Sequence, residues 1–389
     1  MNSADRHEAR YRRRHRNRIE AKRSCTSAAD DFGSVFSYQN LYRSYLKCRK
    51  NVGWKASVQR YIANSPLNVY NTWEQLQNGT YKSPAFYEFT VFERGKKRHI
   101  KSTGIGERVV QNCLCENSLL PLLRRTFIHD NGACLPGKGY DFSVRRMRCH
   151  LQRHIRKHGT DGYILVCDLS SFFDSVPHSQ AVKALSEQIT DSRILGLAEE
   201  LIRQFDPEKP PESRKGLGLG SQISQVLAPV VAGRIDRYVK NALREKLYGR
   251  YMDDFYIISG DKDRLKICRD GLRKKCEEIG LRLSEKKTQI VKLTHGFTWL
   301  KVRWSVTKTG GVRMCIHRSS AIRERRKLKK LRKMMGLGRV TYQDVWNSFQ
   351  CWLSHARRFR SWKIRKNMAD LFCRLFEKDV RKDALYQSI

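Results

Sequence analysis

Three aspartates stand at positions where they can bind divalent metal ions. Asp253 and Asp254 interrupt the apolar run RYMDDFYIIS, and Asp168 ends another apolar run, YILVCDL, 85 residues earlier. Adjacent carboxylates in a half-buried strand repel each other and raise each other's proton affinity unless a cation lies between them. We therefore expect the three aspartates to hold two Mg²⁺ ions, with Mn²⁺ as a substitute, an arrangement that can clamp an in-line phosphoryl transfer. The alternative is a hairpin turn whose two aspartates lie in solvent.

The charge of the chain indicates a polyanionic partner. Lysine and arginine number 78 against 38 aspartates and glutamates, which gives a formal net charge of +40. Such an excess must be solvated or matched by a polyanion, and nucleic acid is the partner it favours. The alternative, a basic protein that is merely soluble, would carry the self-repulsion without any compensating interaction. Binding to nucleic acid should weaken steeply with salt.

The elements that would position the aspartates follow an α+β pattern. Between residues 161 and 310, the short apolar runs YILVCDL, RYMDDFYIIS and FTWLKVRW alternate with stretches of helical periodicity. This pattern predicts a small, mostly antiparallel sheet packed on helices. From about Ser319 the sequence is basic and helical, which predicts a separate helical domain.

The amino-terminal part is expected to be helical around one basic hairpin. Residues 1–30 are rich in arginine and predict a flexible basic arm. Apolar spacing predicts two amphipathic helices between Phe36 and Tyr81 and a further helix between Glu107 and Phe127. Between these helices, AFYEFTVFERGKKRHIKST predicts a β-hairpin that turns at residues 94–96.

A later helix carries His150, His154 and His158 one turn apart. The many arginines of SVRRMRCHLQRHIRKH favour a solvated helix that faces phosphate. A metal site is the alternative, and we reject it because no carboxylate or second cysteine completes a ligand set.

The sequence gives no indication of a membrane or extracellular location. It contains no stretch near the roughly 20 apolar residues that cross a bilayer. Its arginine-rich start has no apolar core of the secretory kind. None of the twelve cysteines forms a CxxC pair, so we expect reduced thiols and a cytoplasmic protein, bacterial or prophage-encoded.

Five ordered motifs between about residues 90 and 305 resemble those of reverse transcriptases. YMDD resembles the family's catalytic hairpin, DLSSFFDSV its first palm motif, and GLGLGSQISQ the glycine-bearing loop beneath the templating base. KKRHI with ERVVQ resembles the fingers motif, and LRLSEKKT the motif that closes the palm. Two positions depart from the family pattern: Glu107 stands where an aspartate is usual, and Lys301 where the primer-gripping turn usually has glycine.

The resemblance implies roles for individual residues. Asp168, Asp253 and Asp254 would be catalytic metal ligands, and Phe173 would press on the sugar of the incoming nucleotide and exclude a 2′ hydroxyl. Arg98 would hold the triphosphate, with Lys96 a weaker candidate, and Lys287 would neutralise the pyrophosphate unless it is an ordinary surface lysine. The remaining nucleotide-binding candidates are Leu169 and Leu219. The candidates for template or primer contact are Gly220, Ser224, Gln225, Tyr251, Met252, Trp299 and Leu300.

The loop from Leu219 to Gln225 is similar to that of enzymes of diversity-generating retroelements. It begins with an aliphatic residue and ends Ser-Gln, where most reverse transcriptases begin with glutamine and end with serine-proline. The likeness implies error-prone copying at adenines, because leucine offers the nascent pair no hydrogen bond. The alternative is that Leu219 is an ordinary packing residue.

The whole resemblance implies a right-hand polymerase. Its parts would be an amino-terminal extension and fingers over residues 31–160, a palm over 161–305 and an all-helical thumb over 306–389. Its partners would be a template RNA, the RNA/cDNA duplex, dNTPs and a small accessory protein. The rivals are another bacterial reverse transcriptase, from a group II intron, retron or phage-defence system, and a non-catalytic RNA-binding protein.

Overall fold

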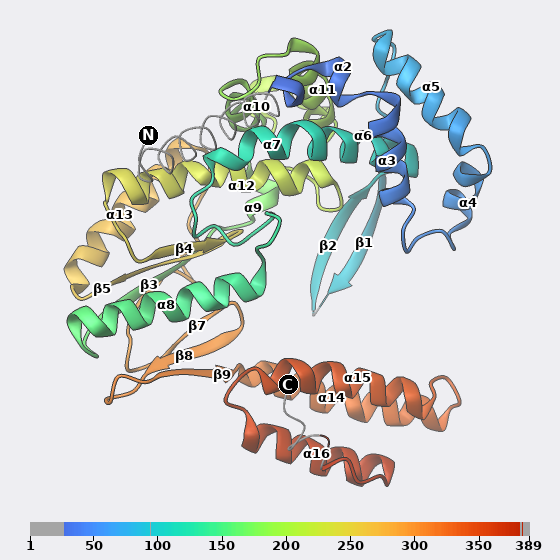
Figure 1. Ribbon diagram of the computed structural model, residues 1–389. Coiled ribbons are helices and arrows are strands. Elements are labelled where there is room, and N and C mark those ends of the chain that lie inside the picture. The colour runs from blue at the N-terminus through green and yellow to red at the C-terminus, as the bar shows by residue number, and fades with distance from the viewer. Residues whose placement is uncertain (1–26, 94, 382, 384–389) are drawn as a thin grey trace, which may run out of the picture.

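The computed structural model describes residues 27–93, 95–381 and 383 of the 389, without the side chain of Lys96. The predicted arm over residues 1–30 therefore lies mostly outside the described residues. The chain folds into a helical upper part, a central sheet and a lower part of three helices (Figure 1). No described helix is long and apolar enough to cross a membrane.

The central sheet has four strands in the order β4-β5-β3-β6, all antiparallel. They are β3 (Tyr163–Asp168), β4 (Tyr248–Tyr251), β5 (Asp254–Ser259) and β6 (Gln289–Lys292). Successive side chains of a strand point to opposite faces. Accordingly, Leu165 and Cys167 enter one hydrophobic core and Ile164 and Val166 enter another. Both faces of β3 are thus covered, which explains its continuous apolar run.

Helices surround this sheet. In Figure 1, α8 (Tyr140–His158) covers one face and α12 (Gln222–Arg237) and α13 (Lys262–Glu278) lie on the other side. The remaining helical segments between the strands are α9 (Phe172–Ser175), α10 (His178–Ser186), α11 (Ser192–Arg203), η3 (Pro211–Ser213) and η4 (Tyr238–Ala242).

The upper part contains the predicted basic hairpin, β1 (Tyr87–Glu93) and β2 (Lys96–Ser102), which is antiparallel and confirmed. The helices of this part are α2 (Phe32–Val35), α3 (Tyr38–Cys48), α4 (Ala56–Ala63), α5 (Ser65–Gln77), α6 (Ile105–Leu114), η1 (Cys115–Leu119), α7 (Leu120–Leu123) and η2 (Arg124–Thr126). Where two helices were expected before the hairpin, the structure has α3, α4 and α5, since α4 ends at Asn64 and α5 begins directly after it.

The lower part begins with a three-stranded antiparallel sheet of β7 (Phe297–Trp299), β8 (Val302–Val306) and β9 (Val312–Ile316). Strand β9 lies in the region expected to be all helical from residue 306, so the helical part starts only at α14. The helices are α14 (Arg318–Gly336), α15 (Tyr342–Arg357) and α16 (Trp362–Phe376). Their core is aromatic: the rings of Phe349 and Phe372 stack at 4.7 Å.

The α+β fold class, with small antiparallel sheets and a helical carboxyl-terminal part, is confirmed. The expectation that the histidine face of α8 is solvated is wrong for two of its three residues. His150 and His154 are buried, and hydrogen bonds compensate for the lost water. His150 bonds the hydroxyl of Tyr256 at 2.9 Å, and His154 Nε2 donates to the carbonyl of Asp161 at 2.8 Å. Among the described cysteines, all eleven are free thiols, as expected.

Candidate active site

Two of the predicted catalytic aspartates face each other across neighbouring strands. Asp168 ends β3 and Asp254 begins β5, and the antiparallel register pairs these two residues directly. The third, Asp253, lies in the turn between β4 and β5, where its carbonyl accepts a hydrogen bond from the Leu169 amide at 3.2 Å. The turn is tight, since Met252 has a left-handed backbone with φ 56°. Residues 85 positions apart in sequence therefore meet at one end of the central sheet.

The electrostatics of this end favour a bound cation. Burial, together with the charges of Asp253 and Asp168, raises the pKa of Asp254 to about 7. Lys287 Nζ lies 2.6 Å from Asp168 Oδ2. Burial alone would lower the pKa of Lys287, yet its bond to Asp168 and the neighbouring aspartates raise it. Lys287 is thus an ion-paired lysine at the carboxylates, although its side chain stays half exposed.

The donor chemistry at this position fits Mg²⁺ or Mn²⁺, which prefer carboxylate oxygens. The side chains are not arranged as a finished metal site, because within the described residues no three His, Cys, Asp or Glu side chains are grouped to hold an ion. The ammonium of Lys287 takes the place of a cation beside Asp168. The assignment of two metal ions to Asp168, Asp253 and Asp254 stays a prediction.

A buried arginine that the sequence reading missed supports the turn. Arg250 and Asp236 form an ion pair at 2.6 Å in which both side chains are fully buried. Arg250 also donates to the carbonyl of Met252 at 3.1 Å, and Tyr248 donates to Asp236. A signal for this pair existed, because each charged residue interrupts an apolar run and a buried charge needs a partner.

The glycine-bearing loop is fixed against the hairpin. The Lys101 amide donates to the carbonyl of Leu219 at 3.0 Å. Gly220 has φ 110°, and a Cβ there would lie 2.9 Å from the carbonyl oxygen of Lys101, so the close approach requires glycine. Leu219 is half buried, Gln225 is exposed, and Ser224 is buried with no partner for its hydroxyl among the described residues.

Helix α6 holds the same loop from its other side. Ser221 donates to Gln111 at 2.7 Å, and Gln111 donates to Glu107 at 3.0 Å. Tyr81 donates to the other oxygen of Glu107. The unusual Glu107 is therefore a buried link in a hydrogen-bond chain that runs from Tyr81 to the loop, a role that only the folded chain reveals.

The two nucleotide-binding candidates on the hairpin, Arg98 and Lys96, are not shown to contact the carboxylates. Arg98 pairs with Glu93 on the opposite strand at 2.9 Å, and its side chain is about half exposed. Lys96 begins β2, and its side chain lies outside the described atoms. Strand β1 is exposed along its whole length, so this strand of the hairpin stands free of the core.

The remaining candidates lie around the turn and the third sheet. Phe173 is half buried on α9, directly after the Asp168 strand, and Leu169 is buried. Tyr251 is half buried before the turn. Trp299 is buried in the core with its ring against Tyr256 at 4.9 Å, and Leu300 follows it in a left-handed turn with φ 49°.

An antiparallel sheet that brings aspartates of neighbouring strands together, in a chain of such positive charge, is the arrangement of a nucleotidyltransferase. Residues 109–304 match the family described as reverse transcriptase (RNA-dependent DNA polymerase). This match covers half of the chain, and the chain belongs to that family. The predicted enzyme class, RNA-directed DNA polymerase, is confirmed at this level.

Individual relatives are distant. Protein YkfC of Escherichia coli (strain K12) is 24% identical over 263 residues, which cover 58% of this chain and 68% of that protein. The putative COX1/OXI3 intron 2 protein of Saccharomyces cerevisiae is 27% identical over 82 residues, 20% of this chain and 10% of that protein. A telomerase from Candida albicans, solved with a fragment of telomeric RNA, matches with a TM-score of 0.47 and 10% identity over 80% of this chain and 60% of its own. At that level of likeness the telomerase carries no argument about function.

Proposed function

We propose that the chain synthesises DNA on an RNA template at the carboxylates of Asp168, Asp253 and Asp254, with two Mg²⁺ ions as cofactors. The observation that carries this proposal is the cross-strand pairing of Asp168 with Asp254, together with the Leu169 amide bonded to the carbonyl of Asp253. Bound divalent ions supply the charge that activates a primer 3′ hydroxyl and stabilises the leaving pyrophosphate.

The chain's own side chains would bind and orient the substrates. Phe173, half buried beside the carboxylates, would exclude a ribose 2′ hydroxyl and offer it no hydrogen bond. Arg98 would exchange Glu93 for the nucleotide triphosphate, whose oxygens suit a guanidinium better than a single exposed carboxylate does. The ammonium of Lys287 would move from Asp168 to the leaving pyrophosphate and neutralise part of its charge. Lysines and arginines of the α14–α16 region, proposed as the thumb, would meet duplex phosphates without reading sequence.

Primer extension on RNA and DNA templates, with each nucleotide type and with Mg²⁺ or Mn²⁺, tests this function. We expect dNTP incorporation on RNA, and Asp253→Asn should abolish it while RNA binding persists. Asp174→Asn, a change at an exposed aspartate close to Asp168 in sequence, is the matched control and should keep activity. A non-catalytic RNA-binding protein would instead show no extension in the wild type and no effect of Asp253→Asn.

An RNA polymerase is distinguished from a DNA polymerase by Phe173→Ala. The smaller side chain should improve ribonucleotide use by at least about tenfold, as expected when a steric clash is relieved. Unchanged discrimination between dNTPs and NTPs would contradict the proposed steric gate.

We further propose that the enzyme serves a diversity-generating retroelement and copies its template RNA with errors at adenines. The support is the loop itself: Leu219 offers no hydrogen-bonding side chain, and Gln225 is exposed on the first turn of α12. A pair of near-identical repeats, one rich in adenine substitutions, next to the gene would favour this class. Without the repeats, a group II intron, retron or phage-defence enzyme is the better assignment.

A further inference from the structure

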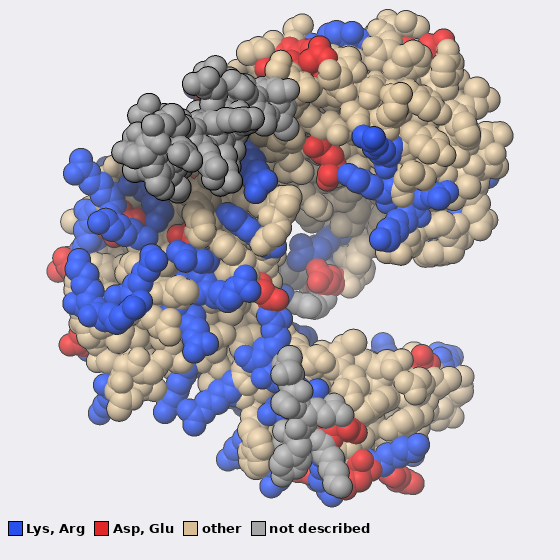
Figure 2. All heavy atoms as spheres, viewed as in Figure 1, with Lys and Arg blue, Asp and Glu red and all other residues tan. Residues whose placement is uncertain are grey.

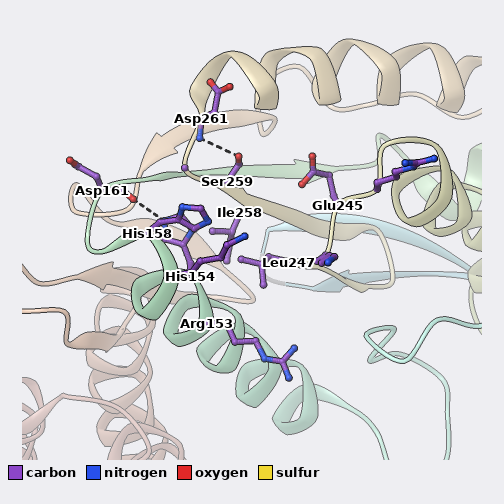
Figure 3. Close-up of a pocket in the computed structure, with 13 residues that line it drawn as sticks. Arg153, His154, His158, Asp161, Glu245, Leu247, Ile258, Ser259 and Asp261 are labelled. Carbon is purple, nitrogen blue, oxygen red and sulfur yellow. Dashed lines mark hydrogen bonds between the residues drawn. The ribbon is translucent and has the colours of Figure 1, made fainter.

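A cavity of about 640 Å³ lies at the end of the central sheet that is opposite to the carboxylates. It is bordered by the last turn of α8, the segment 244–247 before β4, and the turn after β5 (Figure 3). The register places Tyr163 beside Ser259 at this end and Asp168 beside Asp254 at the other. Five residue steps along β3 separate the two ends by about 17 Å.

The cavity has an excess of positive charge. Four of its lining residues are permanently cationic and exposed: Arg153, Lys157, Arg244 and Lys246. Among the described residues, no ion pair is recorded between any of these four and a carboxylate.

The acidic residues of the lining are already occupied. Glu245 pairs with Arg264 at 2.8 Å and Asp161 pairs with Lys292 at 3.1 Å, and neither basic partner borders the cavity. Asp261 accepts the amide of Asp263 as the cap of α13. Two of the three lining acids are therefore paired with cations outside the cavity, and within the described residues no ion pair joins the third, Asp261, to any of the four.

The cavity has a fixed floor. His154 is buried, and its Nε2 donates to the carbonyl of Asp161 at 2.8 Å, which joins α8 to the start of β3 (Figure 3). Gly162 makes this possible, since a Cβ there would lie 2.2 Å from His154 Nε2. Leu247 and Ile258 add apolar lining. The walls thus combine a packed floor with exposed cationic side chains.

The backbone on one side of the cavity is strained. Arg244 has a left-handed backbone with φ 55°, which an arginine adopts at a cost. In Figure 2, lysine and arginine gather on the left of the view, where α13 and the ends of α8 and β5 lie in Figure 1. The cavity therefore opens within a broader basic surface.

From this arrangement we infer a second RNA-binding site, in which Arg153, Lys157, Arg244 and Lys246 bind phosphates of a strand outside the primer–template duplex. Arginine suits phosphate because its planar fork can donate two hydrogen bonds, and lysine adds a point charge. A strand held at the opposite end of the sheet, about 17 Å from the carboxylates, is not the segment being copied. RNA is the polyanion that a member of this family meets as its template.

The test compares two ligands and needs no catalysis, so it stands apart from the proposed polymerase activity. The first ligand is a short RNA/DNA primer–template, and the second is the same duplex with a long single-stranded RNA extension. The variant is Arg153→Gln, Lys157→Gln, Arg244→Gln and Lys246→Gln together. We expect at least about tenfold weaker binding of the extended ligand and a salt dependence shallower by about two to three ions. Binding of the short duplex should stay unchanged.

The matched control removes four exposed cations elsewhere, with Arg43→Gln, Lys50→Gln, Lys55→Gln and Arg60→Gln on and around α3 and α4. An equal loss in both variants would show a general charge effect and overturn the site. An equal loss for both ligands, or no loss, would overturn it as well. If inorganic phosphate at millimolar concentration displaces the extension as well as RNA does, the cavity binds free anions and the RNA assignment fails. Thermal unfolding of the variants at the wild-type temperature checks that they are folded.

Discussion

At the scale of single residues, the carboxyl of Asp254 is the most perturbed group at the candidate site. It is partly buried beside two further carboxylates, and the ammonium of Lys287 offsets only part of the repulsion. Its pKa of about 7 is above the value near 3.8 of an exposed aspartate. Between these two values the folded protein binds a proton that the unfolded chain has released.

This proton difference predicts how stability depends on pH. Without divalent ions, stability should fall as pH rises from about 4 to about 7, because over this range the folded state binds a proton that the unfolded chain has released. Magnesium needs the ionised carboxylate, so its affinity should rise roughly tenfold per pH unit up to about pH 7 and then level off. Thermal unfolding with and without Mg²⁺ across this range measures both effects. Asp254→Asn should flatten the metal-free pH dependence, and an unchanged slope in that variant would contradict the assignment to Asp254.

Leu219 also acts as a single side chain, because its backbone is already fixed by the Lys101 amide. Leu219→Gln adds a hydrogen-bonding group without moving that backbone, so we expect misincorporation opposite adenine to fall several-fold. Sequencing of cDNA made on a defined RNA template measures the error spectrum. Leu219→Met, which adds no hydrogen-bonding amide, is the control and should keep the errors. If both variants have the wild-type spectrum, Leu219 is a packing residue.

At the scale of elements, the strongest sequence patterns gave the correct structures. The apolar runs that end at Asp168 and surround Asp253 form adjacent strands, and the alternating run around residues 87–102 forms the hairpin. Periodicity reports burial along one element, so it was reliable there. Periodicity also placed Asp168 and Asp254 on strands, and the register of those strands in the structure pairs the two residues.

The same patterns failed where burial depends on partners distant in sequence. His150 lies in an arginine-rich helix yet is buried, because Tyr256 and Asp130 surround it. The ion pair of Arg250 with Asp236 is likewise formed by two elements, and periodicity contains no information about such pairs. The hypothesis of a metal site could be reached from the residues. That Arg250 and Asp236 each need a partner could also be inferred, but not that they pair with each other.

The Arg250 pair predicts a positioning effect on catalysis. Arg250→Gln should destabilise the protein by about 3–5 kcal/mol, since it leaves the Asp236 charge buried. The combination Arg250→Met, Asp236→Leu and Tyr248→Phe removes the polar groups together and should recover much of that stability. The Met252 carbonyl still lacks its donor in this variant, so we expect a lower kcat and a weaker response to Mg²⁺. Urea unfolding and magnesium titration of primer extension separate the two effects. Recovery of activity along with stability would show that Arg250 has a structural role alone.

At the scale of the whole molecule, the positive charge dominates. The hollow between the upper part and the three carboxyl-terminal helices is bordered by lysine and arginine in Figure 2. A second cavity, with Arg323, Lys327 and Lys330 of α14 in its lining, lies between that helix and the turn at Leu300. In the proposed function, these cations would contact the phosphates of the primer–template duplex.

The charge predicts strongly salt-dependent binding to a primer–template. With six or more phosphate contacts, affinity should fall about a thousandfold between 50 and 200 mM salt. Fluorescence anisotropy at several salt concentrations gives the slope directly. A slope near zero would mean that phosphates contribute little and would contradict the interpretation of the net charge.

The exposed hairpin has a mechanical consequence. The aspartates belong to a sheet that is packed on both faces, whereas β1 has no covered face and β2 is joined to the glycine loop through Lys101 and Leu219. In the proposed polymerase, we expect opening and closing around an incoming nucleotide to take place mainly in the hairpin, while the acids keep their spacing. The glycine loop, bonded to β2 through Lys101 and Leu219, would then move with the hairpin.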